Sequence, residues 1–321
     1  MKVLITGGAG FIGGHLTEAL LKRGDEVIVA DNFSTGSERN LFPVDGRSAE
    51  VVRMDVATDK ELLRKLIKES DVIFHLAAAV GVELVVNEPV RTIETNINGS
   101  ANVITLASEY GKRLFLASTS EVYGKSFKEE FCENDDLLIG ASYNSRWSYA
   151  CSKLMDEFYL MAYRRQNGLP GTVVRFFNTV GPRQTGQYGM VVPRFVQNAL
   201  AGKPLQVYGD GGQSRCFCHV SDVVRALLLL LETPESIGGI YNIGSRRLVT
   251  IKELAELVIS RTNSTSGIEY VPYTVAYAEG FEDMRRRMPS TAKLNELTGW
   301  TPQKTLEDVI DDVAAELKSR G

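Results

Sequence analysis

Short runs of consecutive apolar residues alternate, through the first half of the chain, with stretches in which apolar residues recur every three or four positions. The continuous runs predict strands that are buried on both faces, at residues 2–6, 26–30, 51–54, 72–76, 113–118 and 172–177. Stretches with helical spacing lie between them, at residues 11–23, 60–69, 90–110 and 148–167. Repeated strand–helix units of this kind predict an α/β protein with a doubly wound parallel sheet.

The second half of the chain is less regular. Helical spacing returns in three stretches, at residues 190–201, 251–262 and 305–319. Two short apolar runs predict further strands, at residues 205–207 and 240–243. Ser221 stands where it would cap another helix, which continues to about Leu231. Because no long linker separates the two halves, we expect a second, smaller lobe built from interleaved segments.

The composition narrows the class of protein. With 44% hydrophobic and 24% charged residues among 321, the chain has the profile of a globular protein. Its 36 basic residues against 40 acidic ones leave a net charge of −4 without a basic stripe, which argues against a nucleic-acid partner. The longest apolar run, from Val223 to Leu231, is broken by Arg225 and is far shorter than a membrane-spanning helix, so we expect no membrane partner.

The chain ends and the cysteines bear on where the protein works. The N-terminus runs directly into the first predicted strand, without the pattern of a secretory signal. The four cysteines are too few and too irregularly spaced for a disulfide framework, and Cys216 and Cys218 lack the spacing of metal ligands. We therefore expect a cytoplasmic protein with reduced thiols and no metal site.

A glycine-rich turn joins the first predicted strand to the first predicted helix. Gly7, Gly10 and Gly13 form a GxxGxxG pattern there. Such a turn lets the backbone approach a pyrophosphate at the N-terminus of a helix. Asp31 follows the second strand, where a carboxylate bonds both ribose hydroxyls of a dinucleotide and repels a 2′-phosphate. The pattern therefore predicts a dinucleotide site and favours NAD over NADP.

Tyr149 and Lys153 are spaced i, i+4 on a predicted helix, so their side chains reach the same face. A lysine ammonium beside a phenol stabilises the phenolate, which makes the tyrosine a usable base near neutral pH. Ser118, Thr119 and Ser120 end the preceding strand, and a hydroxyl from this triplet can hold a substrate oxygen against the tyrosine. Behind a dinucleotide turn, this combination predicts a reaction at a substrate oxygen.

The expected cofactor site extends beyond the glycine turn. Asp55 and Val56 follow the third strand, where they either flank the adenine or form a solvated strand end. The residues that we expect to contact NAD are Gly7, Gly10, Phe11, Ile12, Gly13, Asp31, Asn32, Asp55, Val56, Leu76, Ala77, Ala78, Asn96, Ser118, Tyr149 and Lys153.

These motifs resemble those of the extended short-chain dehydrogenase/reductase family, and within it the NAD-dependent nucleotide-sugar epimerases and dehydratases. The similarity covers nearly the whole chain. It implies a bound NAD that oxidises C4 of a UDP- or dTDP-linked sugar, followed by 4-epimerisation, 4,6-dehydration or decarboxylation. We expect a Rossmann-type NAD-binding domain at residues 1–177, rejoined by residues 219–243, and a nucleotide-sugar-binding lobe at residues 178–218 and 244–321.

The residues around the predicted base distinguish these reactions. Thr119-Ser120-Glu121-Val122-Tyr123-Gly124 resembles the UDP-glucuronate decarboxylases, including UDP-xylose synthases, whereas 4-epimerases usually carry a small or polar residue in place of Glu121 and 4,6-dehydratases an Asp-Glu pair. Residues 146–153 are similar to the RWxYxxxK segment of UDP-apiose/UDP-xylose synthase and of the decarboxylase that forms a UDP-4-keto-pentose. Residues 277–283 and 285–290 resemble the late GxGxxD…RKPS stretch of the same enzymes, with Met288 in place of their usual lysine or apolar residue.

The resemblance implies roles for individual residues. Once C4 of a glucuronate is a ketone, its C6 carboxylate is lost through an enolate, and the protein need only hold charge in place. Glu121 and Arg287 would position the carboxylate and handle the proton at C5. The implied catalytic set is Tyr149, Lys153, Thr119, Ser120, Glu121 and Arg287. The implied contacts to the UDP-sugar are Asn178, Val192, Arg194, Gln206, Tyr208, Arg215 and Arg287.

The function that we expect is NAD-dependent decarboxylation of UDP-glucuronate, giving UDP-xylose or a UDP-4-keto-pentose. A UDP-sugar 4-epimerase is the nearest alternative, and a 4,6-dehydratase or a non-catalytic NAD-binding module fits the motifs less well. The partner is then a UDP-sugar substrate. The predicted helices at 90–110 and 148–167 form a dimer-making bundle in similar proteins, so we also expect a homodimer.

Overall fold

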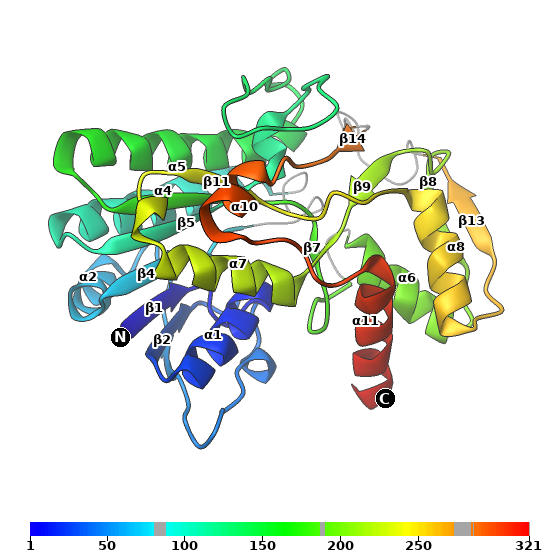
Figure 1. Cartoon of the computed structure of the whole chain (residues 1–321), viewed down its shortest axis with the longest axis horizontal. Coiled ribbons are helices and arrows are strands. Elements are labelled where there is room, and N and C mark those ends of the chain that lie inside the picture. The colour runs from blue at the N-terminus through cyan, green and yellow to red at the C-terminus, as the bar shows by residue number, and fades with distance from the viewer. Residues whose placement is uncertain (80–87, 187–189, 273–283, 285, 321) are drawn as a thin grey trace.

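The computed structural model of the chain describes residues 1–79, 88–186, 190–272, 284 and 286–320. A seven-stranded sheet with the strand order β11-β6-β5-β4-β1-β2-β3 forms its centre, and every neighbouring pair is parallel (Figure 1). The strands are β1 (Lys2–Thr6), β2 (Glu26–Asp31), β3 (Glu50–Arg53), β4 (Val72–His75), β5 (Arg113–Thr119), β6 (Gly171–Phe176) and β11 (Ile240–Ile243). The predicted α/β fold of the Rossmann type is confirmed.

Both faces of this sheet are buried, as the continuous apolar runs require. In β1, Val3 and Ile5 pack into one hydrophobic cluster and Leu4 into another on the opposite face. The first cluster includes side chains of the helices α1 (Phe11–Arg23) and α7 (Val220–Glu232). The second includes side chains of α2 (Lys60–Glu69), α4 (Pro89–Glu109) and α5 (Arg146–Asn167).

The order of the strands reverses between β1 and β4. The chain first builds β2 and β3 on one side of β1, and then β4, β5, β6 and β11 on the other side. In doubly wound sheets a ligand crevice forms at this point, beyond the carboxyl ends of the strands. The glycine turn after β1 and the serine–threonine triplet at the end of β5 both lie at that edge.

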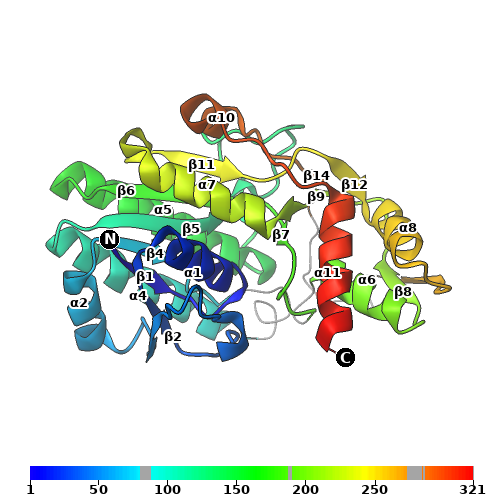
Figure 2. The same ribbon diagram turned by 60° about the horizontal axis from the view of Figure 1, so that its bottom comes forward.

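In the part of the chain that the structure describes, a smaller lobe is built on three helices and short strands, at the right of Figure 1 and again in Figure 2. Its helices are α6 (Val191–Leu200), α8 (Ile251–Thr262) and α11 (Leu306–Arg320), whose apolar faces share one cluster. Its strands form three small sheets: β8 (Leu205–Tyr208) with β13 (Ile268–Val271), β9 (Ser214–Cys216) between β12 (Leu248–Thr250) and β14 (Arg286–Arg287), and β7 (Thr179–Val180) with β10 (Cys218–His219).

The connections contain short 3₁₀ helices, among them η1 (Glu38–Asn40), η2 (Ser120–Tyr123) and η3 (Pro234–Ser236). Within the residues that the structure describes, no helix is long and apolar enough to span a bilayer.

Two local features differ from what the sequence pattern predicts. The cap of α7 is His219 and not Ser221, because the Nδ1 atom of His219 accepts the backbone N–H of Ser221 at 3.0 Å. The helix α10 (Ala292–Thr298), late in the chain, packs on β11, and its Leu294 belongs to the cluster of α1 and α7. This late segment therefore lies on the large sheet.

Candidate active site

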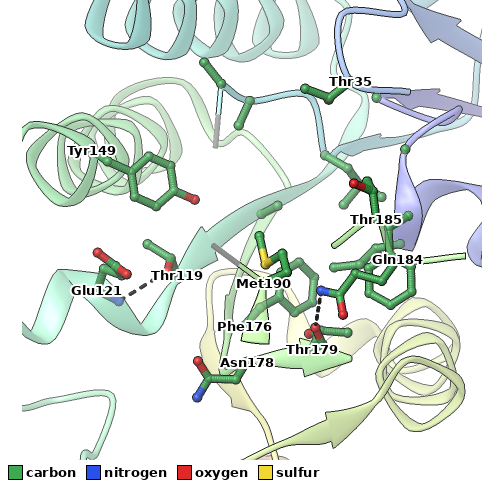
Figure 3. A pocket seen from close by; sticks show the side chains of 18 of the residues that line it. Thr35, Thr119, Glu121, Tyr149, Phe176, Asn178, Thr179, Gln184, Thr185 and Met190 are labelled. Carbon is green, nitrogen blue, oxygen red and sulfur yellow. Dashed lines mark hydrogen bonds between the residues drawn. The ribbon is translucent and has the colours of Figure 1, made fainter. Parts of the chain in front are cut away.

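A cavity of about 660 Å³ runs from the carboxyl edge of the large sheet to the smaller lobe (Figure 3). Residues of β2, β5 and α5, and residues that follow β1 and β4, line one end, and residues of α6, β8 and β9 line the other. The cavity brings together nearly all the residues that the sequence singled out, although they are spread from position 7 to position 287.

The glycine turn forms a cradle that leaves no room for side chains. Gly7 has a φ of 72°, and a Cβ atom there would lie 2.6 Å from the backbone nitrogen of Ala77. A Cβ atom on Gly13 would lie 2.3 Å from the carbonyl oxygen of Gly7. Gly10 is the N-cap of α1 and contributes no side-chain cap, so the first N–H groups of the helix face the cavity, where Phe11 and Ile12 also line it. This cradle fits the pyrophosphate of a dinucleotide.

The carboxylate of Asp31 lies at the end of β2 and lines the cavity. Its two oxygens accept the backbone N–H groups of Ala9 at 2.9 Å and Phe33 at 2.8 Å. Burial raises the pKa of Asp31, and these two hydrogen bonds act in the opposite direction. The donors fix the orientation of a carboxylate that would bond ribose hydroxyls and repel a 2′-phosphate, so the residues present fit NAD.

The next strands complete this end of the cavity. The amide of Asn32 donates to Asp55 Oδ2 at 2.9 Å, and both residues line the cavity with Val56. Leu76, Ala77, Ala78 and Ser118 line it as well. Asn96 does not line it: its amide bonds both the N–H and the C=O of Ala79, at 2.7 and 3.2 Å, so it holds the backbone of the segment after β4. Its contact with a cofactor would be indirect.

The predicted base, Tyr149, points its hydroxyl into the cavity, beside Thr119 and Glu121 (Figure 3). Thr119 Oγ1 accepts the backbone N–H of Glu121 at 3.2 Å, which orders the start of η2 under the tyrosine. Burial raises the pKa of Tyr149 above its usual value, the charge of Glu121 raises it further, the Thr119 hydroxyl lowers it, and the charge of Asp156 adds to the rise.

Lys153 is buried at the base of the cavity and forms an ion pair. Its Nζ lies 2.8 Å from Asp156 Oδ2, and only 3% of either side chain is exposed. The lysine that the sequence assigns to the phenol is therefore held by a carboxylate that the sequence analysis did not single out.

Glu121 lies between two arginines on the cavity wall. Both oxygens of its carboxylate are 3.0 Å from guanidinium nitrogens of Arg146, and Arg287 Nη1 is 3.1 Å from Oε1. Burial alone would raise the pKa of Glu121, but the two guanidinium groups hold it below its usual value. The cluster therefore presents an ionised carboxylate and two positive charges to the cavity beside Tyr149.

Arg146 is a site residue that the sequence analysis quoted in a motif without giving it a role. It stands three residues before Tyr149 on α5, and i, i+3 positions share a helix face, so this spacing could have identified it. Arg287 reaches the cluster from far along the chain because β14 pairs with β9, which sets it beside Arg215. The resembling stretch 277–283 and Arg285 lie outside the described residues.

The far end of the cavity carries the residues expected to hold UDP. Asn178, in the left-handed region with a φ of 29°, donates its amide to the carbonyl oxygen of Cys216 at 2.9 Å. The guanidinium of Arg194 lies 4.5 Å from the ring centre of Tyr208 and donates to its hydroxyl. Arg215 and Gln206 line the same wall.

Val192 does not line the cavity. Its side chain faces the core of the smaller lobe and is 0% exposed, because the apolar face of α6 packs there. Its neighbours Val191 and Pro193 line the cavity in its place. The residues on either side of Val192, and not Val192 itself, are therefore the ones placed to contact a ligand in the cavity.

Further residues without a predicted role complete the wall. Gln184 donates its amide to the carbonyl oxygen of Thr179 at 3.1 Å, and Thr185 and Met190 lie beside them (Figure 3). Gln184 and Thr185 follow β7 in a segment without a regular pattern of apolar positions, so no periodic signal marks them. Within the described part of the chain, no group of three or more His, Cys, Asp or Glu residues could hold a metal ion.

The fold, the glycine cradle and the Tyr149–Lys153 pair define a dinucleotide-dependent enzyme of the short-chain dehydrogenase/reductase type. A family model, "NAD dependent epimerase/dehydratase family", matches residues 3–244. The chain belongs to this NAD-dependent family, as the sequence predicts.

Known proteins similar to the chain include two kinds of decarboxylase. UDP-N-acetyl-alpha-D-glucosaminuronate decarboxylase of Bacillus cytotoxicus is 42% identical, over 97% of this chain and 96% of the relative. UDP-glucuronic acid decarboxylase 1 of Danio rerio is 38% identical, over 97% of this chain and 71% of the relative.

Solved structures of similar shape include epimerases. UDP-glucose 4-epimerase of Thermotoga maritima with UDP-glucose has a TM-score of 0.89 and 32% identity, covering 100% of this chain and 99% of that one. UDP-glucuronic acid 4-epimerase of Bacillus cereus, in complex with UDP-glucuronic acid and NAD, has a TM-score of 0.89 and 25% identity over both whole chains.

Proposed function

We propose that this protein is an NAD-dependent decarboxylase of a UDP-linked glucuronate. The observation that carries the proposal is the ionised Glu121 held between Arg146 and Arg287, on the cavity wall beside Tyr149. The names of similar relatives support the same reaction class. The sugar acids in those names include one with an acetamido group at C2 and one without it.

The cofactor end of the cavity would hold NAD through the glycine cradle and Asp31, with Asn32, Asp55 and Val56 near the adenine. Bound NAD supplies the oxidant for the C4 hydroxyl of the sugar. The chain itself provides the base: Tyr149 accepts the hydroxyl proton, and Thr119 holds the same oxygen in line with the phenol. Lys153 supplies a fixed positive charge at the base of this site.

The Glu121 cluster would then act on the oxidised sugar. A carboxylate at C6 is β to a ketone at C4, so the C5–C6 bond breaks, its electron pair enters an enolate and CO₂ leaves. Arg146 and Arg287 stabilise negative charge, first on the substrate carboxylate and then on the enolate. Glu121 positions this region, and because it is ionised it passes to C5 a proton that it takes from solvent.

The smaller lobe would bind the nucleotide. Arginine grips phosphate oxygens with paired N–H groups, and Arg194 and Arg215 both face the cavity there. Tyr208, Gln206 and Asn178 lie around them. This arrangement supports the division into an NAD-binding domain and a nucleotide-sugar-binding lobe.

A direct assay tests the proposal. The purified protein is incubated with NAD and with UDP-glucuronate or UDP-N-acetylglucosaminuronate, each labelled with ¹³C at C6, and the products are followed by NMR. We expect the label to leave as CO₂ with at least one of the two acids. Retention of the label in an inverted C4 epimer would identify a 4-epimerase, and no turnover of either acid would reject both activities.

Two further properties belong to the proposal. The free cysteines, of which Cys216 and Cys218 are buried, support a cytoplasmic protein. Exposed apolar side chains on α4 and α5 support a homodimer formed through these helices, among them Val90, Met155 and Phe158.

A further inference from the structure

A buried chain of hydrogen bonds ends on Asp156, directly behind the predicted catalytic pair. Tyr149, Lys153 and Asp156 occupy positions i, i+4 and i+7 of α5, so they share one face of the helix. Asp156 Oδ2 accepts hydrogen bonds from Lys153 Nζ at 2.8 Å and from Ser100 Oγ, on α4, at 2.7 Å. The carboxylate thus joins the lysine to a second element of the fold.

The direction of this chain is fixed by its members. Because Ser100 donates its only hydroxyl proton to Asp156, it accepts from His75 Nε2, which lies 3.1 Å away. His75 Nδ1 then accepts from the hydroxyl of Thr6, on β1, at 2.7 Å. Burial lowers the pKa of His75 to about 3, so the ring is neutral and has one N–H to donate. Every proton in the chain points toward Asp156.

This polarity favours Asp156 as an anion although burial raises its pKa. A buried ion pair contributes little to stability compared with apolar residues of the same size. Four elements, β1, β4, α4 and α5, nonetheless contribute polar groups to the hydrogen-bonded network around this ion pair. Because the pair lies next to the reacting Tyr149, we infer that it serves the reaction and not only the stability of the fold.

We propose that Asp156 is a positioning residue, which holds the Lys153 ammonium in place and sets, through its negative charge, the pH at which Tyr149 becomes a base. The other charges that face these groups are Glu121 on η2, which is paired with Arg146 and Arg287, and Glu157 on α5, which is paired with Arg175 of β6. Two carboxylates act on Tyr149: Glu121, whose negative charge is offset by the two arginines, and Asp156, which shares the lysine that would otherwise serve the phenol.

The inference rests on the proposed role of Tyr149 as a base, and the Asp156→Asn substitution tests it. Removing the negative charge leaves the lysine charge unopposed, so Tyr149 should ionise about half to one pH unit lower. The acid limb of the pH profile of kcat/KM should move by the same amount. The phenolate absorbance should move with it in the protein without substrate, after subtraction of the Tyr149→Phe spectrum.

Matched variants separate charge from structure. Asp156→Glu keeps the charge and should keep the parent profile, and Ser100→Ala removes a hydrogen bond without removing charge and should shift the profile less than Asp156→Asn. If Asp156→Asn does not fold, Asp156→Ser, which removes the same charge, takes its place in the test.

The inference would be overturned if the pH at which Tyr149 ionises stays the same or rises in a folded variant without the charge. It would also be overturned if Ser100→Ala shifts that pH as much as Asp156→Asn does. The spectroscopic titration needs no substrate, so its result is independent of the proposed decarboxylation.

Discussion

At the scale of single residues, the charge state of Glu121 decides what the site can do. A buried carboxylate normally favours its neutral form, but Arg146 and Arg287 reverse this by placing positive charge within 3.1 Å of its oxygens. The two guanidinium groups, held in place by Glu121, need no reorganisation when negative charge develops on a substrate.

Glu121→Gln removes that anion and keeps the shape of the side chain. We expect kcat for CO₂ release to fall by roughly 10²-fold or more, with NAD affinity unchanged, because Glu121 lies away from the glycine cradle. Isothermal titration with NAD and the labelled-substrate assay measure the two effects. Glu109→Gln is the matched control, since Glu109 is also paired with an arginine but lies on the surface. A variant that releases CO₂ at the parent rate would contradict the role of Glu121.

Arg146→Met tests the electrostatic argument through pH. In the parent protein the pKa of Glu121 is lowered, so the carboxylate stays ionised below the usual range and the activity that depends on it is lost only as the pH falls through that lowered value. Removing one guanidinium raises the pKa of Glu121, so the acid limb of kcat/KM should move to higher pH. Arg64→Met, at an exposed pair, serves as the control. An acid limb that stays in place would show that Arg146 does not control the charge of Glu121.

At the scale of elements, the turn between β1 and α1 depends on space rather than on charge. Gly13→Ala would press a methyl group against the backbone of Gly7, at 2.3 Å, where no flexible side chain can yield. We expect NAD affinity to fall at least about 10-fold and the free energy of unfolding by about 2 kcal/mol. Gly267→Ala is the control, because no atom lies within 4 Å of a Cβ there. Equal NAD affinity in the two variants would refute the close-packed cradle.

The elements themselves could largely be predicted from the sequence. Strands buried on both faces are continuous apolar runs, and helices with one buried face have a clear period, so β1, α1, α2 and β11 lie where the pattern placed them. The capping of α7 by His219 could not, since it depends on which neighbouring side chain reaches the Ser221 N–H.

The site was predictable only where local spacing carries the chemistry. The glycine turn and the Tyr149–Lys153 pair are local patterns. The cluster around Glu121 is not, because Arg287 arrives through a two-residue strand that pairs with β9 and has no periodic pattern of its own. The orientation of Val192 was equally hard to predict. The apolar pattern does not fix the rotation of α6 about its axis to within one residue, and that rotation decides which side chains face the core and which face the cavity.

At the scale of the whole molecule, the outer surface of α4 and α5 is more apolar than a lone subunit needs. Val90 on α4 is 66% exposed, and Met155 and Phe158 on α5 are 54% and 65% exposed. The two helices pack against each other and cover one face of the sheet (Figure 1). A second copy of the chain, related by a two-fold axis, would bury these side chains in a bundle of four helices.

Phe158→Glu places a charge on that surface. Burying an unpaired carboxylate in an apolar interface is costly, so the mass in solution should fall from that of a dimer to that of a single chain, as measured by light scattering after size exclusion. Phe127→Glu is the control, because Phe127 is 95% exposed and lies outside both helices. A parent protein that already runs as a single chain, or a dimer that survives Phe158→Glu, would place the partner surface elsewhere. The catalytic groups of α5 line the cavity and not the exposed apolar surface, so each subunit should keep its NAD site when the dimer separates.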